Sequence, residues 1–462
     1  MKLKDLENKK VLILGVEKEG MASFRFLRKI FPNKILGLAD QLSAVEKLKL
    51  TQKAKEIIKK DKRKKLHLGK NYLLALSQYD VIFKAPGVPW KKISPYLNKK
   101  QKVTSQTEVF LENCPSPIIG VTGTKGKGTT VSLIYKILKQ EGLKVRLIGN
   151  IGKPVLSFLS GASKTDVFVF EMSSHQLCHL KKSPSIAVFL NLYPAHLDYY
   201  KSFKEYKKSK ENITLWQTKE NYFIFNKDQK CLRELARRTK AKKISFGLKT
   251  KSLDCYVEKD WVFYKKEKIL KTDQIPLKGE FYLYNIMAAI TAAKLFKVSA
   301  KKIRKAIKEF KPLPHRLEFV GKFKGIKFYN DSLATIPESV ILAIKTLNGK
   351  VQTILLGGYE AKQDFKALTK EILRKKIKNL IFFPPTGKRI WEEVLKRKKS
   401  RLPKAFFVDN MKEAVKIAFA QTEKGKICLL SPACPSFGVF KNYKERGNLF
   451  KKFVKLYGQE KN

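Results

Sequence analysis

Residues 118–130 are Ile118-Ile119-Gly120-Val121-Thr122-Gly123-Thr124-Lys125-Gly126-Lys127-Gly128-Thr129-Thr130, and this stretch predicts the fold around it. The apolar beginning predicts a buried strand, and the glycines that follow predict a turn. A helix is expected from Thr129 to Gln140, because Val131, Ile134 and Leu138 recur at helical spacing. Strand, glycine turn and helix, in this order, are the elements of a phosphate-binding loop.

The predicted loop holds anions by three means. Backbone N–H groups point inward, the helix dipole favours negative charge, and Lys127 reaches the outer phosphates of a nucleotide. The stretch departs from G-x-x-x-x-G-K-[ST], since Val121 replaces the first glycine and Gly128 replaces the hydroxyl residue. Thr129, one residue later, offers the hydroxyl for a magnesium ion. A glycine-rich turn with an incidental lysine is the alternative, and the flanking strand and helix favour the phosphate site.

Length and composition indicate several domains. A chain of 462 residues exceeds the usual size of one domain, and 43% hydrophobic residues suffice for a core in each. Two joints that contain proline, Cys114-Pro115-Ser116-Pro117 and Lys311-Pro312-Leu313-Pro314, divide the chain. We therefore expect domains at residues 1–114, 115–312 and 313–462.

The predicted domains alternate strands with helices, which is typical of α/β folds built on parallel sheets. The first domain begins with strand 11–14, the turn Gly15 to Gly20, a helix from Met21 and strand 35–39. This beginning is Rossmann-like, although Glu17 occupies the middle glycine of the dinucleotide pattern. Further strands are expected at 166–170, 186–190, 222–225 and 353–356, and near Leu380, Phe406 and Ile427. The sequence thus predicts a Rossmann-like N-terminal domain, a central P-loop ATPase domain with a parallel sheet, and a Rossmann-like C-terminal domain.

The net charge is +58, from 98 basic and 40 acidic residues, and such a charge is typical of nucleic-acid-binding proteins. The lysines are spread along the whole chain, however, and no helix-turn-helix, zinc-finger or aromatic RNA-binding signature accompanies them. We favour a solvated, lysine-rich surface that suits anionic substrates and binds no specific nucleic acid. A basic nucleic-acid-binding protein that keeps the fold without catalysis is the alternative from another functional class.

The sequence favours a cytoplasmic protein without a membrane segment. No run of about 18 uninterrupted apolar residues occurs. The polar N-terminus also lacks the apolar centre of a signal peptide. Six scattered cysteines without a C-x-x-C pair indicate reduced thiols rather than a zinc site or a disulfide framework.

Polar residues at strand ends predict a metal site near the phosphate loop. Glu171 ends strand 166–170 and His196 follows strand 186–190, where the carboxyl ends of parallel strands form a ligand crevice. Carboxylate and hydroxyl oxygens suit Mg²⁺, so Glu171 and Thr129 predict one ion at the terminal phosphates. A histidine is a less usual magnesium ligand, and a satisfied core histidine is the alternative for His196.

Several motifs together resemble the Mur ligase superfamily over nearly the whole chain. In the family's order they are Gly123-Thr124-Lys125-Gly126-Lys127, Gly149-Asn150-Ile151-Gly152, Glu171 to Leu177, Asn191 to Asp198, and Leu313-Pro314-His315-Arg316. The resemblance is strongest to the members that add D-glutamate, and it rests on Asn330 to Thr335, Gly357 to Glu360 and Ser431 to Gly447. This resemblance implies the use of ATP and Mg²⁺ to join D-glutamate to UDP-N-acetylmuramoyl-L-alanine, through an acyl phosphate, in peptidoglycan synthesis. It also implies a monomer.

The resemblance implies roles for individual residues as well. Lys127, His196 and Lys210 are implied to be catalytic, and Lys210, as a carbamate, joins the metal ligands Thr129, Glu171 and His196. The implied ATP-binding residues are Gly123, Thr124, Lys125, Gly126, Lys127, Gly128, Thr129, Asn285, His315, Arg316 and Asp331. The implied substrate-binding residues are Gly15, Asp40, Asn150, Ser173, Ser436 and Tyr443. A solvated helix lysine is the alternative for Lys210.

Departures from the family pattern concern the adenine contacts and the amino acid. The family's G-x-H-N-x-x-N stretch is Gly279-Glu280-Phe281-Tyr282-Leu283-Tyr284-Asn285 here, so only its last asparagine is kept. Ala361 stands where a D-glutamate-binding lysine is expected, with Lys362 adjacent, and Leu333 stands where some members have lysine. A Mur ligase for a different amino acid is therefore an alternative. A folylpolyglutamate synthase is another, but such ligases place the phosphate loop near the chain start.

Overall fold

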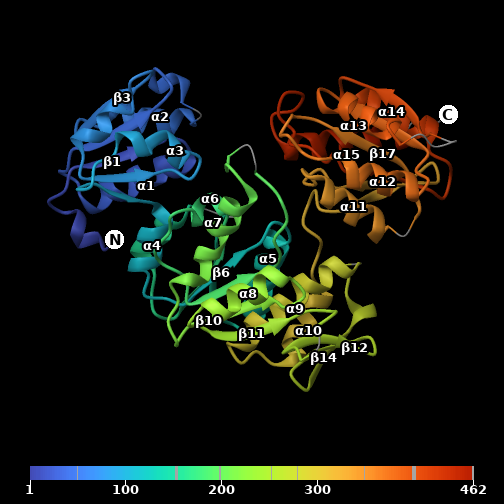
Figure 1. The fold of residues 1–462 in the computed structure, drawn as a ribbon, viewed down its shortest axis with the longest axis horizontal. Coiled ribbons are helices and arrows are strands. Elements are labelled where there is room, and N and C mark those ends of the chain that lie inside the picture. The colour runs from blue at the N-terminus through green and yellow to red at the C-terminus, as the bar shows by residue number, and fades with distance from the viewer. Residues whose placement is uncertain are drawn as a thin grey trace. The chain divides into compact units, whose positions relative to one another are not determined.

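The computed structural model describes residues 1–48, 50–150, 154–196, 199–250, 252–277, 279–347, 349–397 and 402–459. These residues form three sheets, and all but the short ends of the second and third sheets are parallel. The chain divides into two compact units, of which one contains the first two sheets and the other contains the third (Figure 1). The predicted α/β class with parallel sheets is therefore confirmed.

The first sheet has five parallel strands in the order β3-β2-β1-β4-β5. All four residues of β1 are fully buried, as expected for a strand covered by helices on both faces. Because β1 lies between β2 and β4, the turn after β1 occupies the position where open α/β sheets bind ligands. The strands are β1 (Val11–Leu14), β2 (Leu36–Asp40), β3 (Lys64–Leu68), β4 (Val81–Lys84) and β5 (Lys102–Thr104). The helices are α1 (Lys18–Ile30), α2 (Gln52–Lys60), α3 (Trp90–Ile93) and α4 (Gln106–Asn113).

The second sheet has nine strands in the order β14-β13-β12-β11-β10-β9-β6-β8-β7. Strand β6, which carries the decisive stretch, lies between β9 and β8, so the glycine turn after it also occupies a ligand-binding position. The parallel strands are β6 (Ile118–Thr122), β7 (Lys144–Gly149), β8 (Asp166–Glu171), β9 (Ile186–Phe189), β10 (Tyr222–Asn226) and β11 (Lys242–Phe246). An antiparallel extension follows through β12 (Cys255–Glu258), β13 (Trp261–Tyr264) and β14 (Glu267–Lys271).

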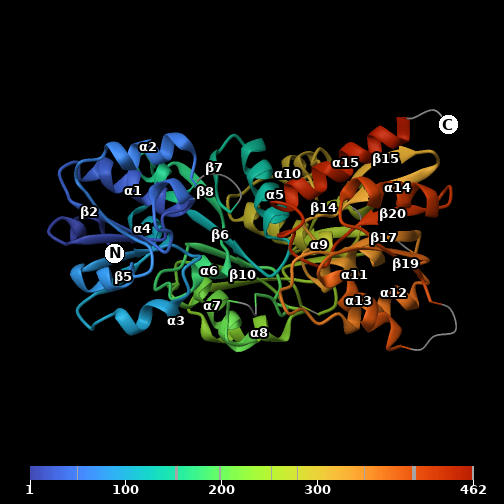
Figure 2. The ribbon, with the colours of Figure 1, turned by 90° about the horizontal axis from the view of Figure 1, so that it is seen from above.

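Helix α5 (Lys127–Gln140) packs on β6, β7 and β8 and against α10, as Figure 2 shows. The predicted apolar positions Val131, Ile134 and Leu138 are fully buried. Every residue of α9 from Asn285 to Ala293 is also buried, so this helix lies in the core rather than on the surface. The remaining helices of this part are α6 (Ser174–Leu177), α7 (Phe203–Leu215), α8 (Lys230–Arg238), α9 (Glu280–Lys294) and α10 (Ala300–Lys308).

The third sheet has six strands in the order β15-β16-β20-β17-β18-β19, and only β15 is antiparallel to its neighbour. Successive residues of β17 face opposite sides, so Ile354 and Leu356 pack on one helical layer while Leu355 packs on the other. The strands are β15 (Glu318–Phe323), β16 (Ile326–Asn330), β17 (Val351–Gly357), β18 (Asn379–Phe383), β19 (Lys404–Phe407) and β20 (Ile427–Leu430). The first layer contains α11 (Pro337–Thr346), α12 (Lys366–Arg374) and α13 (Thr386–Leu395); the second contains α14 (Met411–Gln421) and α15 (Tyr443–Gln459).

The strands that were expected from the sequence are present, but the antiparallel extension β12 to β14 was not predicted. Its first turn is Lys259-Asp260, and both residues have positive φ, at 45° and 63°. Two-residue hairpin turns of this kind usually contain asparagine and glycine. Because Lys259-Asp260 lacks that signal, residues 255–271 gave no hairpin prediction.

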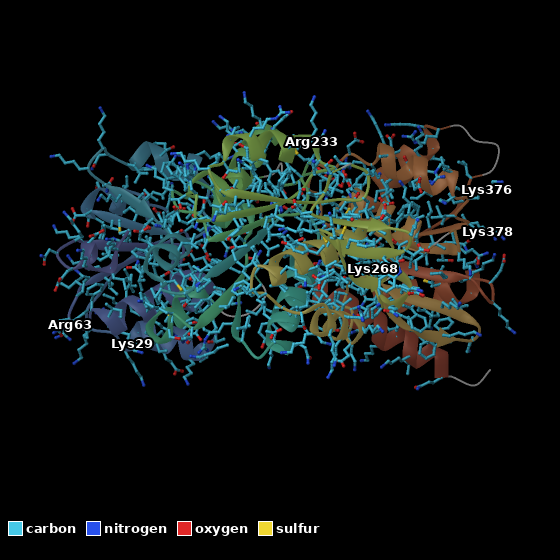
Figure 3. All side chains as sticks on the ribbon, turned by 90° about the horizontal axis from the view of Figure 1, so that it is seen from below. Lys29, Arg63, Arg233, Lys268, Lys376 and Lys378 are labelled. Atoms are coloured by element: carbon cyan, nitrogen blue, oxygen red, sulfur yellow. The ribbon has the colours of Figure 1, made fainter. Side chains whose placement is uncertain are left out.

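Basic side chains are exposed around all three sheets. Figure 3 labels examples from the first, second and third sheet regions, and Lys29, Arg63, Lys268, Lys376 and Lys378 are exposed. The charge of +58 is therefore distributed over the surface, as the lysine spacing in the sequence predicts. Within the described ranges, no helix combines the length and the apolar character that crossing a bilayer requires.

Arg446 on α15 joins two loops of the third sheet. Its Nε donates to Ser332 Oγ at 3.1 Å, and its Nη2 donates to the carbonyl of Ser332 at 2.8 Å. Its Nη1 and Nη2 donate to the carbonyl of Cys434 at 3.2 and 3.1 Å. The side chain is fully buried, and burial lowers the pKa of Arg446 to about 10. The loops after β16 and β20 are thus held together by one guanidinium.

Replacing Arg446 by alanine is expected to lower the free energy of unfolding by about 3 kcal/mol, because two buried carbonyls lose their donors and a cavity opens. Urea denaturation measures the change. Lys444→Ala, an exposed position on the same helix, is the matched control and is expected within about 0.5 kcal/mol of the unsubstituted protein. An unchanged denaturation midpoint for Arg446→Ala contradicts the anchoring role.

Candidate active site

The glycine turn after β6 leads directly into α5, and Gly126 is the residue that shapes it. Gly126 is the N-cap of α5 and has a φ of 83°. A Cβ at this position would overlap Oδ1 of Asn285, so both the backbone conformation and the available space require glycine. The first-turn N–H groups of α5 have no carbonyl one turn earlier, and with the helix dipole they favour an anion. The turn has the form that the sequence predicts for a phosphate site.

Asn191, which follows β9, holds the loop in this form. Its Oδ1 accepts from the N–H of Lys125 at 3.0 Å, and its Nδ2 donates to the carbonyl of Lys125 at 3.1 Å. Thr124 Oγ1 donates to the carbonyl of Tyr193 at 3.1 Å and accepts from its N–H at 2.9 Å. Hydrogen bonds from residues 191–193 therefore hold the conformation of residues 124–125.

Two ammonium groups converge on the carbonyl of Gly123. Lys127 Nζ and Lys210 Nζ each donate to it at 2.9 Å, and Lys210 Nζ also donates to Thr122 Oγ1 at 3.2 Å. Lys210 is only 1% exposed, so it is not a solvated helix lysine. Burial and then the charge of Lys127 lower the pKa of Lys210 well below its usual range, while Glu171 acts in the opposite direction.

The oxygens of Glu171 and Thr129 fit a magnesium ion. Both residues are buried, and Oε2 of Glu171 has no hydrogen-bond partner among the described residues. A buried carboxylate oxygen without a donor is unfavourable unless a cation satisfies it. The part of the chain that the structure describes holds no cluster of three His, Cys, Asp or Glu side chains for a metal. This donor set suits Mg²⁺, which commonly takes one or two carboxylates and completes its shell with phosphate and water oxygens.

His196 lies in the segment Ala195–Lys201, which belongs to the second compact unit. It is exposed with a φ of 58°, and its carbonyl accepts from the N–H groups of Tyr199 and Tyr200. The exposure argues against a core histidine, and the role as a metal ligand stays a prediction. Four residues of the family motifs lie outside the described residues: Ile151, Gly152, Leu197 and Asp198.

The turn after β1 brings Gly15 and Asp40 together. Asp40 Oδ2 accepts from the N–H of Val16 at 2.8 Å, and its Oδ1 accepts from the N–H of Leu42 at 3.1 Å. Gly15 has a φ of 86°, and a Cβ there would lie 2.9 Å from Cβ of Ala85. The buried Asp40 carboxylate therefore shapes the turn that contains Gly15, which the family resemblance implies to be a substrate-binding residue.

Asn150 and Ser173 follow the adjacent ends of β7 and β8, next to Glu171. The N–H of Asn150 donates to the carbonyl of Glu171 at 3.4 Å. Ser173 is the N-cap of α6, and its Oγ accepts from the N–H of Gln176 at 3.2 Å. The structure thus brings Asn150, Glu171 and Ser173 to the same edge of the sheet as the phosphate loop.

The candidate ATP residues of the second unit cluster around His315. Its Nδ1 faces Nδ2 of Asn330 at 3.0 Å, and its ring lies edge-on to Tyr443 with 5.9 Å between centroids. Asp331 Oδ1 accepts from the N–H of Leu317 at 3.1 Å. Burial lowers the pKa of His315, which favours the neutral ring. His315, Asp331 and Tyr443 are therefore neighbours, although they are far apart in the sequence.

Residues 279–285, where the sequence differs from the family pattern, include Tyr282 and Asn285, which have different surroundings. Tyr282 Oη donates to the carbonyl of Arg316 at 3.3 Å, and burial raises the pKa of Tyr282. Asn285 is fully buried, and neither atom of its amide has a hydrogen-bond partner among the described residues. Since its Oδ1 faces Gly126, the asparagine is available to a ligand of the phosphate loop.

The loops after β17 and β20 carry the candidate amino-acid pocket. Ser436 is buried in the second loop, whereas Ala361 and the exposed Lys362 lie in the first. Arg389 of α13 contacts the first loop, because its Nη2 donates to Oε1 of Glu360 at 3.0 Å. The sequence pattern contains no signal for Arg389. Tyr282 lay inside a stretch noted only as a departure, and Asn191 stood in a motif without an assigned role.

Two family models match this chain, and together they cover most of its second and third sheets. The Mur ligase middle domain matches residues 121–293. The Mur ligase, glutamate ligase domain matches residues 315–434. The first match contains the phosphate loop, Glu171, Lys210 and Asn285, and the second contains His315 and Asp331.

Similar proteins extend this likeness over nearly the full length. A UDP-N-acetylmuramoylalanine–D-glutamate ligase of Acetivibrio thermocellus is 35% identical, covering 98% of this chain and 97% of its own. The protein of the same name from Clostridium tetani is 33% identical, covering 98% of both. The MurF ligase of Thermotoga maritima, solved in complex with ADP, shares the fold with a TM-score of 0.58 at 18% identity, over 98% and 97% of the two chains. On these matches, the chain belongs to the Mur ligase family.

Proposed function

We propose that this protein is an ATP-dependent ligase that joins the carboxylate of UDP-N-acetylmuramoyl-L-alanine to the amine of D-glutamate. The observation that carries the proposal is the likeness, over 98% of the chain, to two ligases named for this substrate pair. The phosphate loop with Lys127 supports an ATP site, and the Thermotoga maritima relative binds ADP. The reaction belongs to cytoplasmic peptidoglycan precursor synthesis and so to cell wall biogenesis.

Two successive bond exchanges make the amide. A carboxylate oxygen of the acceptor bonds to the γ-phosphorus while the bond to ADP breaks, which gives an acyl phosphate. The amine of D-glutamate then attacks the acyl carbon and loses a proton, and the bond between that carbon and the phosphate oxygen breaks. Lys127 and the first-turn N–H groups of α5 stabilise the charge on the transferring phosphoryl group.

Thr129 and Glu171 would hold one magnesium ion, and His196 would hold a second. When bound, Mg²⁺ neutralises charge on the transferring phosphoryl group. Lys210 supplies a further oxygen ligand as a carbamate, which forms when its free amine bonds to the carbon of CO₂ and releases a proton. The lowered pKa of Lys210 supports this step, because more of the amine is unprotonated at neutral pH.

The remaining site residues have three roles. The ATP contacts are made by residues 123–129, Asn285, Arg316 and Asp331. The acceptor contacts are made by Gly15, Asp40, Asn150 and Ser173, and the D-glutamate contacts are made by Ser436 and Tyr443. The protein works as a cytoplasmic monomer with domains at 1–114, 115–312 and 313–462, and without a membrane or a specific nucleic acid as partner.

A Mur ligase for a different amino acid is the second candidate, because Ala361 stands where the family pattern expects a D-glutamate-binding lysine. Arg389 bears on this choice. Its Nη1 donates to the carbonyl of Gln363 at 2.9 Å, and its guanidinium lies 4.6 Å from the ring centroid of Phe365. Because Arg389 already pairs with the carboxylate of Glu360, this arginine alone does not select an amino acid with a second carboxylate.

Phosphate release from ATP is expected only when UDP-N-acetylmuramoyl-L-alanine and D-glutamate are both present, because the acyl phosphate needs the first and its breakdown to the amide needs the second. A coupled phosphate assay measures release while the acceptor and the amino acid are varied separately. L-Lysine with the same acceptor and D-glutamate with a folate acceptor are the controls. Equal turnover in either control contradicts the specific assignment.

Lys127→Ala is expected to lower kcat by about a hundredfold or more, because the ammonium acts on charge that develops in the transition state. Steady-state ADP release, measured with both co-substrates at saturation, gives the comparison. Lys139→Ala is the control, since Lys139 is exposed at the other end of the same helix. If Lys127→Ala and Lys139→Ala are equally active, Lys127 has no role in the phosphoryl transfer.

Lys210→Ala is expected to lose activity and to recover part of it when formate or acetate is added, because a small carboxylate can occupy the position of the carbamate. The recovery is measured as turnover against carboxylate concentration. Lys208→Ala, an exposed lysine of the same helix, should stay fully active and gain nothing from the added salts. A Lys210→Ala protein that is inactive at every carboxylate concentration argues against the carbamate.

A further inference from the structure

Glu19 of α1 is connected through Gln176 to Ser173, although 157 residues separate Glu19 from Gln176. Nε2 of Gln176 donates to Oε1 of Glu19 at 3.0 Å. Oε1 of Gln176 accepts from the N–H of Ser173 at 3.0 Å and faces its Oγ at 3.2 Å. Both ends of the Gln176 amide are therefore engaged: Ser173 donates to its oxygen, and Glu19 accepts from its nitrogen.

The surroundings of Glu19 are polar and buried. Lys84, Gln106 and Gln176 are between 3% and 6% exposed. Burial raises the pKa of Glu19 and lowers the pKa of Lys84 to about 8. Oε2 of Glu19 has no hydrogen-bond partner among the described residues. A position that served only stability would favour an apolar side chain here, because buried carboxyl groups with an unused oxygen are unfavourable.

The hydrogen-bonded chain connects the turn after β1 with the turn after β8. Glu19 precedes Gly20, and a Cβ at Gly20 would overlap the carbonyl of Gly15, so Glu19 is fixed to the turn after β1. Lys84 Nζ donates to the carbonyl of Val88 at 2.9 Å, and the loop of Val88 packs on Gly15. At the other end, Ser173 follows β8 beside Glu171. All of these residues belong to the same compact unit.

We propose that Glu19 is a positioning residue for the muramoyl-alanine end of the acceptor substrate. It orients the amide of Gln176, and that amide orients the N–H and hydroxyl of Ser173. The turn that takes the nucleotide is thereby coupled to the turn that takes the carboxylate. This inference rests on the proposed function, in which Ser173 contacts the acceptor carboxylate.

Calorimetric titration with UDP and with UDP-N-acetylmuramoyl-L-alanine, both without ATP, tests the proposal. Glu19→Ala is expected to weaken binding of the complete acceptor about tenfold and to leave UDP binding within about twofold, because only the carboxylate end loses its oriented donors. Glu19→Gln is expected to retain most of the affinity, since its amide oxygen can accept from Nε2 of Gln176. Glu56→Ala, an exposed position on α2, is the matched control.

The possible outcomes distinguish failure of the positioning role of Glu19 from failure of the proposed function. If Glu19→Ala keeps the full difference in affinity between UDP and the complete acceptor, or weakens both equally, the positioning role is overturned. If the unsubstituted protein binds the acceptor no more tightly than UDP, the proposed function fails, and the inference fails with it. Should Glu19→Ala not fold, Gln176→Met removes the same amide at similar volume. This variant is then expected to lose the additional affinity for the complete acceptor over UDP. If it keeps that additional affinity, the proposal is overturned.

Discussion

The carbonyl of Gly123 accepts hydrogen bonds from Lys127 and Lys210, and the central site depends on this shared acceptor. Two ammonium groups around one carbonyl repel each other, and burial of Lys210 removes the water that would screen them. Burial first, and the charge of Lys127 second, lower the pKa of Lys210. Asn191 and Gly126 fix the loop around this carbonyl.

The same construction recurs at each sheet. Candidate ligand turns follow strands at which the strand order reverses, and in each case one buried polar side chain fixes the turn. Asp40 holds the turn after β1 through backbone N–H groups, and Asn191 holds the loop after β6 through Lys125. Arg446 holds the loops after β16 and β20 through their carbonyls. The sheets supply rigid strand ends, and these side chains convert them into sites.

The sequence predicted what depends on local pattern. Strand β1 and helix α5 were found from apolar spacing, and the phosphate loop from its glycines and Lys127. It could not predict contacts that depend on the tertiary fold: the burial of Lys210, or the bond between Glu19 and Gln176 across 157 residues. Arg389 was missed for the same reason, because an arginine on an amphipathic helix usually faces solvent. The sequence pattern thus indicated candidate site residues, and the fold shows what holds them in place.

The net positive charge attracts anionic substrates but does not select among them. The proposed substrates ATP, a uridine diphosphate sugar and D-glutamate are all anions, and a surface field from a net charge of +58 attracts all of them alike. Such a field raises encounter rates and is screened by salt, so it cannot distinguish one anion from another. Discrimination must therefore come from groups with fixed directions, such as the N–H and hydroxyl of Ser173, which Gln176 contacts. The stability given up by burying Lys210 and Arg446 is consistent with that requirement, because a buried polar group favours one arrangement of its partners over the others.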